Sequence, residues 1–260
     1  MDAGAGDRRS KRAIVRRRRS PRHLAKGGTA VQTEEGGEIM CGRFTLATEW
    51  DVLQEYFPFE VPPGLEPLAP RYNIAPAEPI WTLRGRADGI AQLQSMRWGL
   101  VPAWAKDLST AFINARVETV ATKPAFRHAF ASGRVIVPAD GYYEWAEEAG
   151  GKQPYRVVDA NGHPLLLAGV SSRWHGPDGP LSTVAIVTRS AAPNLTALHP
   201  RMPLILDPDF AREWLYGEAA AWLPRLVTPP DPPPLRAYPV SRRVNRAGTN
   251  DPTFIEPVGA

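Results

Sequence analysis

The chain contains a single cysteine, Cys41, which directly follows Met40. If translation starts at Met40, or if the preceding segment is removed, Cys41 carries a free α-amine beside its thiol. An α-amine titrates near pH 8 and a thiol near about 8.5, so both groups are partly nucleophilic at neutral pH. Such a 1,2-aminothiol condenses with an aldehyde to an imine, which the sulfur closes into a five-membered thiazolidine. The alternative for an isolated cysteine is a small, buried apolar residue.

Three other polar residues have side chains that could assist such a reaction. Glu144 lies between Tyr143 and Trp145, where desolvation would raise the pKa of its carboxyl group and suit it to proton transfer. His199 could shuttle protons near neutral pH, and the amide of Asn114 could orient an amine or a carbonyl. Each has an ordinary alternative: an exposed loop carboxylate, a structural histidine, and a turn or cap asparagine.

Five arginines lie in short motifs along the chain, three of them within two residues of Cys41, Asn114 or His199. A guanidinium group matches the oxygen atoms of a phosphate, and the ring faces of Trp98 and Trp104 are surfaces on which bases could stack. Taken singly, each arginine could form an ion pair and each tryptophan could pack in the core. As a set they indicate a nucleic-acid ligand; the five are Arg43, Arg71, Arg97, Arg116 and Arg201.

The elements that must position these residues are predicted to be mainly short strands. With 28 prolines and 22 glycines in 260 residues, loops should be frequent and long helices rare. The hydrophobic pattern predicts helices at 48–57, capped by Thr48, at 118–130 and at 209–222. The dipeptide Asn161-Gly162 indicates a hairpin between two of the strands. Strands are predicted at 42–46, 79–84, 90–98, 134–138, 155–158, 165–170, 181–188, 204–206 and 238–244. The sequence therefore indicates a single, strand-rich α+β domain.

Residues 1–39 differ in composition from the rest of the chain. They hold ten Lys and Arg against five Asp and Glu, whereas the remainder holds 21 against 22. Their Gly-rich and Arg-rich composition predicts a disordered basic extension, followed by one domain over 40–260. Arg16–Arg19 could be a nucleic-acid-binding arm. The Glu- and Gly-rich run 34–38 resembles a translated ribosome-binding site, so we hypothesise that Met40 is the true initiator.

Composition also excludes several classes of protein. The sequence has no run of about 18 apolar residues, so no membrane helix is predicted. It has no secretory signal, and one cysteine cannot form an internal disulfide, which together indicate the cytoplasm. The five histidines and the cysteine show no metal-ligand spacing, so we expect neither a metal nor another cofactor.

Six motifs in a fixed order give the chain a resemblance to a known family. It resembles the SRAP family, the SOS-response-associated peptidases or abasic-site processing proteins, from residue 40 to residue 258. The closing segment Ile255–Val258 is also similar. The six motifs are Met40–Phe44, Arg71–Pro76, Met96–Pro102, Asn114–Thr119, Gly141–Trp145 and His199–Pro203.

The resemblance implies a fold and a reaction. The fold would be a barrel-like mixed β core with flanking helices. Cys41, as the mature N-terminus, would attack the ring-opened aldehyde of an abasic site in single-stranded DNA and form a thiazolidine crosslink. Asn114 would position the amine and the sugar, and Glu144 would act as acid and base in formation and reversal. His199 would assist proton transfer and support a β-elimination (lyase) side reaction.

The resemblance also implies a DNA-binding surface. Arg43, Arg116 and Thr188 would contact phosphates, while Trp98 and the segment 71–76 would form a wedge and stacking surface. Arg71 and Arg201 would belong to the same surface. The implied partner is single-stranded DNA containing abasic sites, bound by a monomer that associates with the bacterial nucleoid when on DNA.

Two departures from the family pattern matter. Thirty-nine residues precede Met40, and with them in place Cys41 has an amide instead of an amine. Autoproteolytic trimming or a start at Met40 would restore the aminothiol. In addition, Arg189 follows Thr188 where a second small hydroxyl residue is expected, which affects local DNA contacts rather than the chemistry.

Two other classes of function compete with this interpretation. Met-Cys-Gly also begins glutamine amidotransferases whose N-terminal cysteine attacks an amide, and a related variant is a Cys–His protease that acts on other proteins. Alternatively, the arginines and tryptophans alone could make a passive single-strand-binding module. Such a module would bind in a salt-sensitive manner but form no adduct that survives SDS.

Overall fold

The computed structural model describes Met1, residues 41–66 and residues 69–259. The predictions for residues 2–40, including the disordered extension, lie outside this part. Within it, the chain forms four α-helices, which are α1 (Trp50–Tyr56), α2 (Arg127–Ser132), α3 (Pro208–Tyr216) and α4 (Ala219–Val227). No helix in the described part is long and apolar enough to cross a membrane.

Five strands form a closed, mixed barrel. The strands β11 (Gly179–Ser190), β10 (Leu165–Gly176), β7 (Arg134–Ala139), β4 (Pro79–Gly85) and β5 (Ala91–Trp98) pair in that order, each antiparallel to the next. The ring closes because β5 also pairs with β11, in parallel, through Thr183↔Arg97 and Val184↔Trp98. The predicted α+β class and barrel-like core are confirmed.

Four short strands pair with the end segments of barrel strands. β2 (Phe59–Glu60) continues beyond β5, and β12 (Arg201–Pro203) pairs with the end of β11. β6 (Asn114–Arg116) also pairs with β11, and β13 (Ile205–Leu206) with β10. Because β6 and β12 lie on opposite edges of β11, they bring two of the sequence motifs to the same strand end.

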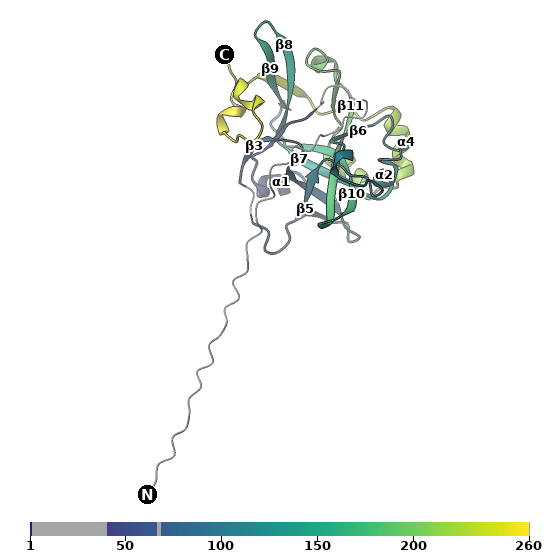
Figure 1. Cartoon of the computed structure of the whole chain (residues 1–260). Coiled ribbons are helices and arrows are strands. Elements are labelled where there is room, and N and C mark those ends of the chain that lie inside the picture. Colours follow the sequence, from purple (N-terminus) through teal and green to yellow (C-terminus); the bar gives the residue numbers. More distant parts are fainter. Residues whose placement is uncertain (2–40, 67–68, 260) are drawn as a thin grey trace.

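A second, antiparallel sheet stands beside the barrel. Its order is β14 (Leu235–Pro239), β9 (Gly151–Asp159), β8 (Gly141–Glu148), β1 (Phe44–Leu46) and β3 (Arg71–Ile74). In Figure 1 the β8–β9 pair extends away from the barrel and lies beside the C-terminal segment, drawn in yellow. There Tyr143 packs with Val240, Val244 and Phe254. This sheet is the one that places the cysteine, because β1 begins three residues after Cys41.

Two of the predicted helices begin later in the chain than expected. α1 begins after Glu49, and Thr48 does not cap it, because its backbone N–H and hydroxyl both bond to Asp140. The predicted helix at 118–130 is a series of turns until Arg127. Pro124 explains this difference, since proline lacks an N–H and disfavours the helical conformation in the residue before it.

Three further predictions were wrong about which strands pair or where an element ends. The strands on either side of Asn161-Gly162 do not pair, because β9 lies in the second sheet and β10 in the barrel. The helix predicted at 209–222 breaks at Gly217, where a Cβ would approach the Glu213 carbonyl oxygen to 2.6 Å. The last strand, β14, ends at Pro239, and a 3₁₀ helix follows over Arg242–Asn245, capped by the Ser241 hydroxyl.

Candidate active site around Cys41

Cys41 and Glu144 meet at the start of the second sheet. The backbone nitrogen and the sulfur of Cys41 each donate a hydrogen bond to Glu144 Oε1, both at 2.9 Å. Pairing of Phe44 with Tyr142 sets this register between β1 and β8, so residues 103 positions apart come into contact. Cys41 has a φ of 43°, which L-residues rarely adopt. One carboxylate oxygen thus bonds both nucleophilic atoms that the sequence analysis singled out.

The surroundings keep the thiol protonated. Burial raises the pKa of the Cys41 thiol well above its ordinary value, and the charge and hydrogen bond of Glu144 raise it further. The positive charge of Arg201 opposes this shift. The thiol is 3% exposed and Glu144 is 5% exposed, so little water screens the pair. Because the sulfur is neutral at rest, its reaction requires a proton acceptor, and the nearest acceptor is the carboxylate that it already bonds.

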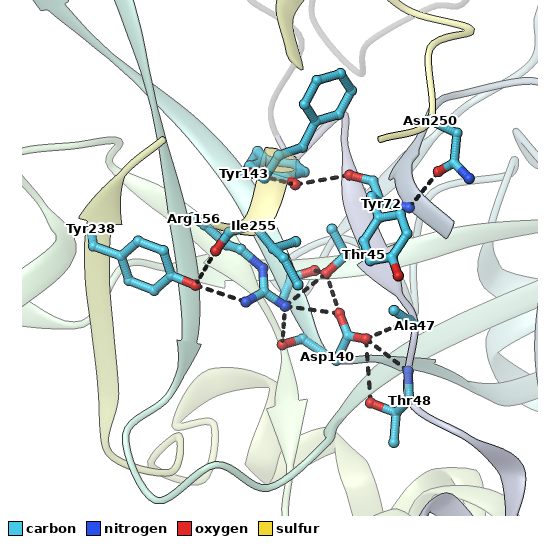
Figure 2. A network of polar contacts seen from close by, with 12 residues as sticks. Thr45, Ala47, Thr48, Tyr72, Asp140, Tyr143, Arg156, Tyr238, Asn250 and Ile255 are labelled. Atoms are coloured by element: carbon cyan, nitrogen blue, oxygen red, sulfur yellow. Dashed lines mark hydrogen bonds and ion pairs between the residues drawn. The ribbon is translucent and has the colours of Figure 1, made fainter. Parts of the chain in front are cut away.

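A buried polar network fixes β1 against β8 (Figure 2). Asp140, directly before β8, accepts hydrogen bonds from the Thr45 hydroxyl and from the backbone N–H groups of Ala47 and Thr48. Arg156 pairs with the same carboxylate at 2.9 Å, and its side chain is only 9% exposed. Neither residue is predicted from the sequence as part of the site; the available signal is an aspartate between an apolar strand and Gly141. This network determines how β1 delivers Cys41 to Glu144.

On the other side of Cys41, Arg201 is held in a network with Glu118. Both terminal guanidinium nitrogens of Arg201 bond to the Glu118 carboxylate, at 2.5 and 2.9 Å, and one also donates to the Thr188 carbonyl oxygen at 2.8 Å. The ring nitrogen Nδ1 of His199 accepts a hydrogen bond from the Arg201 backbone at 3.0 Å. His199 is half-buried. Arg201 therefore links the histidine motif to β11.

Asn114 and Arg116 reach the same region through β6. Pairing of Asn114 with Ile186 and of Arg116 with Thr188 places this motif along β11. Asn114 is buried and Arg116 is half-buried. The end of β11 thereby gathers the asparagine, histidine and arginine motifs, and of these residues Arg201 acts electrostatically on the Cys41 thiol.

The comparison with known proteins agrees with this arrangement. The profile of the family described as SOS response associated peptidase (SRAP) matches residues 40–247. The chain belongs to the SRAP family.

Relatives cover almost all of the SRAP region. The abasic site processing protein YoqW of Bacillus subtilis is 38% identical over 225 residues, which cover 84% of this chain and 99% of the relative. The abasic site processing protein YedK of Escherichia coli is 34% identical over 226 residues, covering 84% and 100%. A solved phage-related protein from Bordetella bronchiseptica is 30% identical with a TM-score of 0.62, covering 78% of this chain and 95% of its own. The fold is thus that of solved SRAP-like structures.

Two residues expected at the SRAP DNA-binding surface are buried instead. Trp98 is completely buried, packs edge-on against Phe44 at 5.2 Å, and donates its indole N–H to the Ile113 carbonyl oxygen. The prediction of a stacking face at Trp98 is therefore wrong, because core packing uses both ring faces. Thr188 is also completely buried, and Arg201 donates a hydrogen bond to its carbonyl oxygen; the phosphate contact of its side chain stays a prediction. Trp104, by contrast, is 63% exposed.

Two further arginines of the SRAP motifs, Arg43 and Arg71, have partners within the protein. Arg43 donates to Asn73 Oδ1 at 2.7 Å and to the Val244 carbonyl oxygen at 2.9 Å. Arg71 pairs with Glu78 and lies opposite Leu46, at the far end of β1 from Cys41. Both guanidinium groups thus help to join β1 and β3 to other parts of the chain. Across the described residues, no group of three or more His, Cys, Asp or Glu side chains could hold a metal ion.

Proposed function

We propose that this SRAP protein captures abasic sites in single-stranded DNA as a covalent adduct on Cys41. The observation that carries the proposal is the pair of 2.9 Å contacts from the nitrogen and sulfur of Cys41 to one Glu144 oxygen. The relatives with full-length matches are named abasic site processing proteins, which indicates the substrate. An abasic deoxyribose in its ring-opened form presents an aldehyde, the group that a 1,2-aminothiol captures.

The reaction requires that Cys41 be the first residue of the mature protein. The SRAP profile begins at Met40, which supports a mature start at Cys41. This start would follow either from initiation at Met40 with hydrolytic removal of that methionine, or from self-cleavage that removes residues 1–40 and accounts for the word peptidase in the family description. In both cases the nitrogen next to Glu144 becomes an amine.

The proposed steps balance without any co-reactant. The Cys41 amine attacks C1′ of the aldehyde, and the resulting carbinolamine loses one water to give an imine. The sulfur then bonds to the same carbon while the thiol proton passes through Glu144 to the nitrogen, which closes the thiazolidine. In the reverse direction the proton passes from the nitrogen back to the sulfur, and one water is consumed to regenerate the aldehyde. Glu144 serves both directions because its oxygen contacts both reacting atoms.

The surrounding motifs would supply the remaining roles. His199 and Asn114 would assist proton transfer and orient the sugar, and the histidine would support β-elimination as a lyase side reaction. Arg43, Arg71, Arg116 and Arg201 would form the cationic surface for phosphates. Since Trp98 is buried, the stacking face would be Trp104, whose ring is 63% exposed.

One gel experiment tests the proposal. Protein beginning at Cys41 is incubated with an abasic single-stranded oligonucleotide and then heated in SDS. We expect a stable adduct that Cys41→Ala abolishes and that Glu144→Gln forms and reverses at least tenfold more slowly. An exposed carboxylate on the same strand, Glu147, provides the control Glu147→Gln, which should behave as the parent.

The second part of the test compares protein that retains residues 1–40 with protein that begins at Cys41. Protein that retains residues 1–40 should form no thiazolidine until it is trimmed, and the appearance of adduct should follow the loss of mass. A crosslink on the intact, untrimmed chain, or an undiminished crosslink on Cys41→Ala, would rule out the aminothiol mechanism. Release of ammonia from glutamine would instead support an amidotransferase.

A further inference from the structure

A polar pocket lies at the opposite end of the barrel from Cys41. It has a volume of about 420 Å³, within the range of small-molecule sites. Its rim includes Ser182 on β11, whereas the Cys41 side of the same strand is marked by Thr188. Six residues of strand separate these positions by about 20 Å. The pocket is therefore distinct from the candidate active site.

The register of the barrel strands collects basic and hydroxyl side chains at this pocket. Arg173 of β10 lies directly opposite Ser182, and Ser171 opposite Val184, so these four side chains share one face. Arg84 comes from β4, and its Nη1 lies 3.5 Å from the Ser171 hydroxyl. His128, on α2, also lines the pocket.

The lining contains no carboxylate. Two guanidinium groups, one imidazole, four serine hydroxyls and one glutamine amide surround the space. Neither Arg84 nor Arg173 has an ion-pair partner among the residues that the structure describes, whereas Arg71 and Arg201 on other surfaces do. Guanidinium forks with hydroxyl donors match the oxygens of a tetrahedral anion. The positive charge of this pocket is therefore not neutralised by the described residues and is available to bind an anionic ligand.

We propose that this end of the barrel is a binding site for a phosphate group, built on Arg84 and Arg173. Ser171 is held in place because its hydroxyl donates to the Gly133 carbonyl oxygen at 2.8 Å, which leaves its lone pairs toward Arg84. The phosphate could belong to a free nucleotide or to the phosphorylated end of a DNA strand. Both present the same dianionic group, and the pocket has room for little more than a nucleotide. The site is independent of the covalent chemistry at Cys41.

Calorimetric titration of the full chain with inorganic phosphate and with thymidine 5′-monophosphate tests this site. Ionic strength is held constant with sodium chloride, and thymidine without phosphate is the blank. The key variant is Ser182→Asp, because position 182 is exposed and an aspartate there would face Arg173 and occupy it. Ser182→Asn is the matched neutral control.

We expect both phosphate ligands to bind, with at least tenfold weaker binding to Ser182→Asp and a change of less than threefold in Ser182→Asn. Arg84→Gln and Arg173→Gln should each weaken binding similarly. Any phosphate bound near Cys41 contributes equally to both position-182 variants, so their difference reports this pocket alone. Equal affinity of the two variants, or no phosphate-dependent heat in the parent, would overturn the proposal.

A competition arm identifies the source of the phosphate. Single-stranded oligonucleotides with and without a 5′-phosphate are added to the phosphate-loaded protein. Selective displacement by the phosphorylated strand assigns the pocket to a DNA end, and displacement only by the mononucleotide assigns it to a free nucleotide. Adduct formation on abasic DNA should be unchanged in Ser182→Asp, so failure of the pocket and failure of the Cys41 mechanism are separable.

Discussion

Glu118 holds the guanidinium of Arg201 in a two-pronged ion pair, with N–O distances of 2.5 and 2.9 Å. The same fork is the geometry with which an arginine binds a phosphate. Burial raises the pKa of the Glu118 carboxyl group, but its bonds to Arg201 outweigh that effect and hold the pKa below the ordinary value. Glu118 therefore stays ionised near neutral pH and competes with DNA for Arg201.

This competition predicts that Glu118→Gln binds undamaged single-stranded DNA more tightly than the parent protein. Releasing one guanidinium to a phosphate should steepen the dependence of log affinity on log salt by about 0.7. Fluorescence anisotropy at several salt concentrations measures the slope. Glu55→Gln removes one negative charge from an exposed position on α1 and is the control for net charge. An identical slope for the two variants would show that Arg201 remains unavailable to DNA.

The thiol of Cys41 provides a prediction for pH dependence. Since burial and Glu144 both raise its pKa, the thiolate fraction at pH 8 should be smaller than that of an ordinary cysteine. Alkylation by iodoacetamide should consequently be slow at pH 8 and rise at higher pH. Glu144→Gln removes the negative charge but leaves the burial, so its alkylation profile should move to lower pH without reaching that of a free thiol. Profiles that coincide would mean that Glu144 does not act on the sulfur.

The network around Asp140 predicts a large loss of stability on a conservative change. Asp140→Asn leaves the buried guanidinium of Arg156 without its counter-charge, which costs about 3–5 kcal/mol in comparable buried pairs. The exposed pair of Arg86 and Asp88 is the matched control, and Asp88→Asn should cost less than about 1 kcal/mol. Urea unfolding measures both values. Similar losses for the two variants would contradict the role of Asp140 in fixing β1 against β8.

Trp98 and Trp104, which lie six residues apart in the sequence, should respond in opposite ways to truncation. Trp98→Ala removes a fully buried ring and should lower the free energy of unfolding by about 3–5 kcal/mol. Trp104→Ala should leave stability almost unchanged but weaken single-strand binding by about 1–3 kcal/mol if a base stacks there. Thermal unfolding and anisotropy separate the effects. Unaltered DNA binding by Trp104→Ala would remove this ring from the proposed surface.

Local sequence signals located three of the five barrel strands closely and failed where distant segments compete. The runs at 79–84, 90–98 and 134–138 match β4, β5 and β7 to within a residue or two, since alternation and apolar character are carried by each run itself. Asn161-Gly162 does form a turn, with Gly162 at a φ of 84°. It joins two different sheets because a turn sets only the local chain direction.

By itself, the sequence determined which chemical groups the protein contains: one cysteine after a methionine, a glutamate among aromatic residues, and arginines in ordered motifs. Only the tertiary structure decided how those groups meet. The pairing of β1 with β8 placed Cys41 beside Glu144, the packing of distant segments buried Trp98 and Thr188, and Glu118 formed an ion pair with Arg201. The physical reason is that burial and long-range pairing depend on which surfaces pack together. No short window of sequence contains that information.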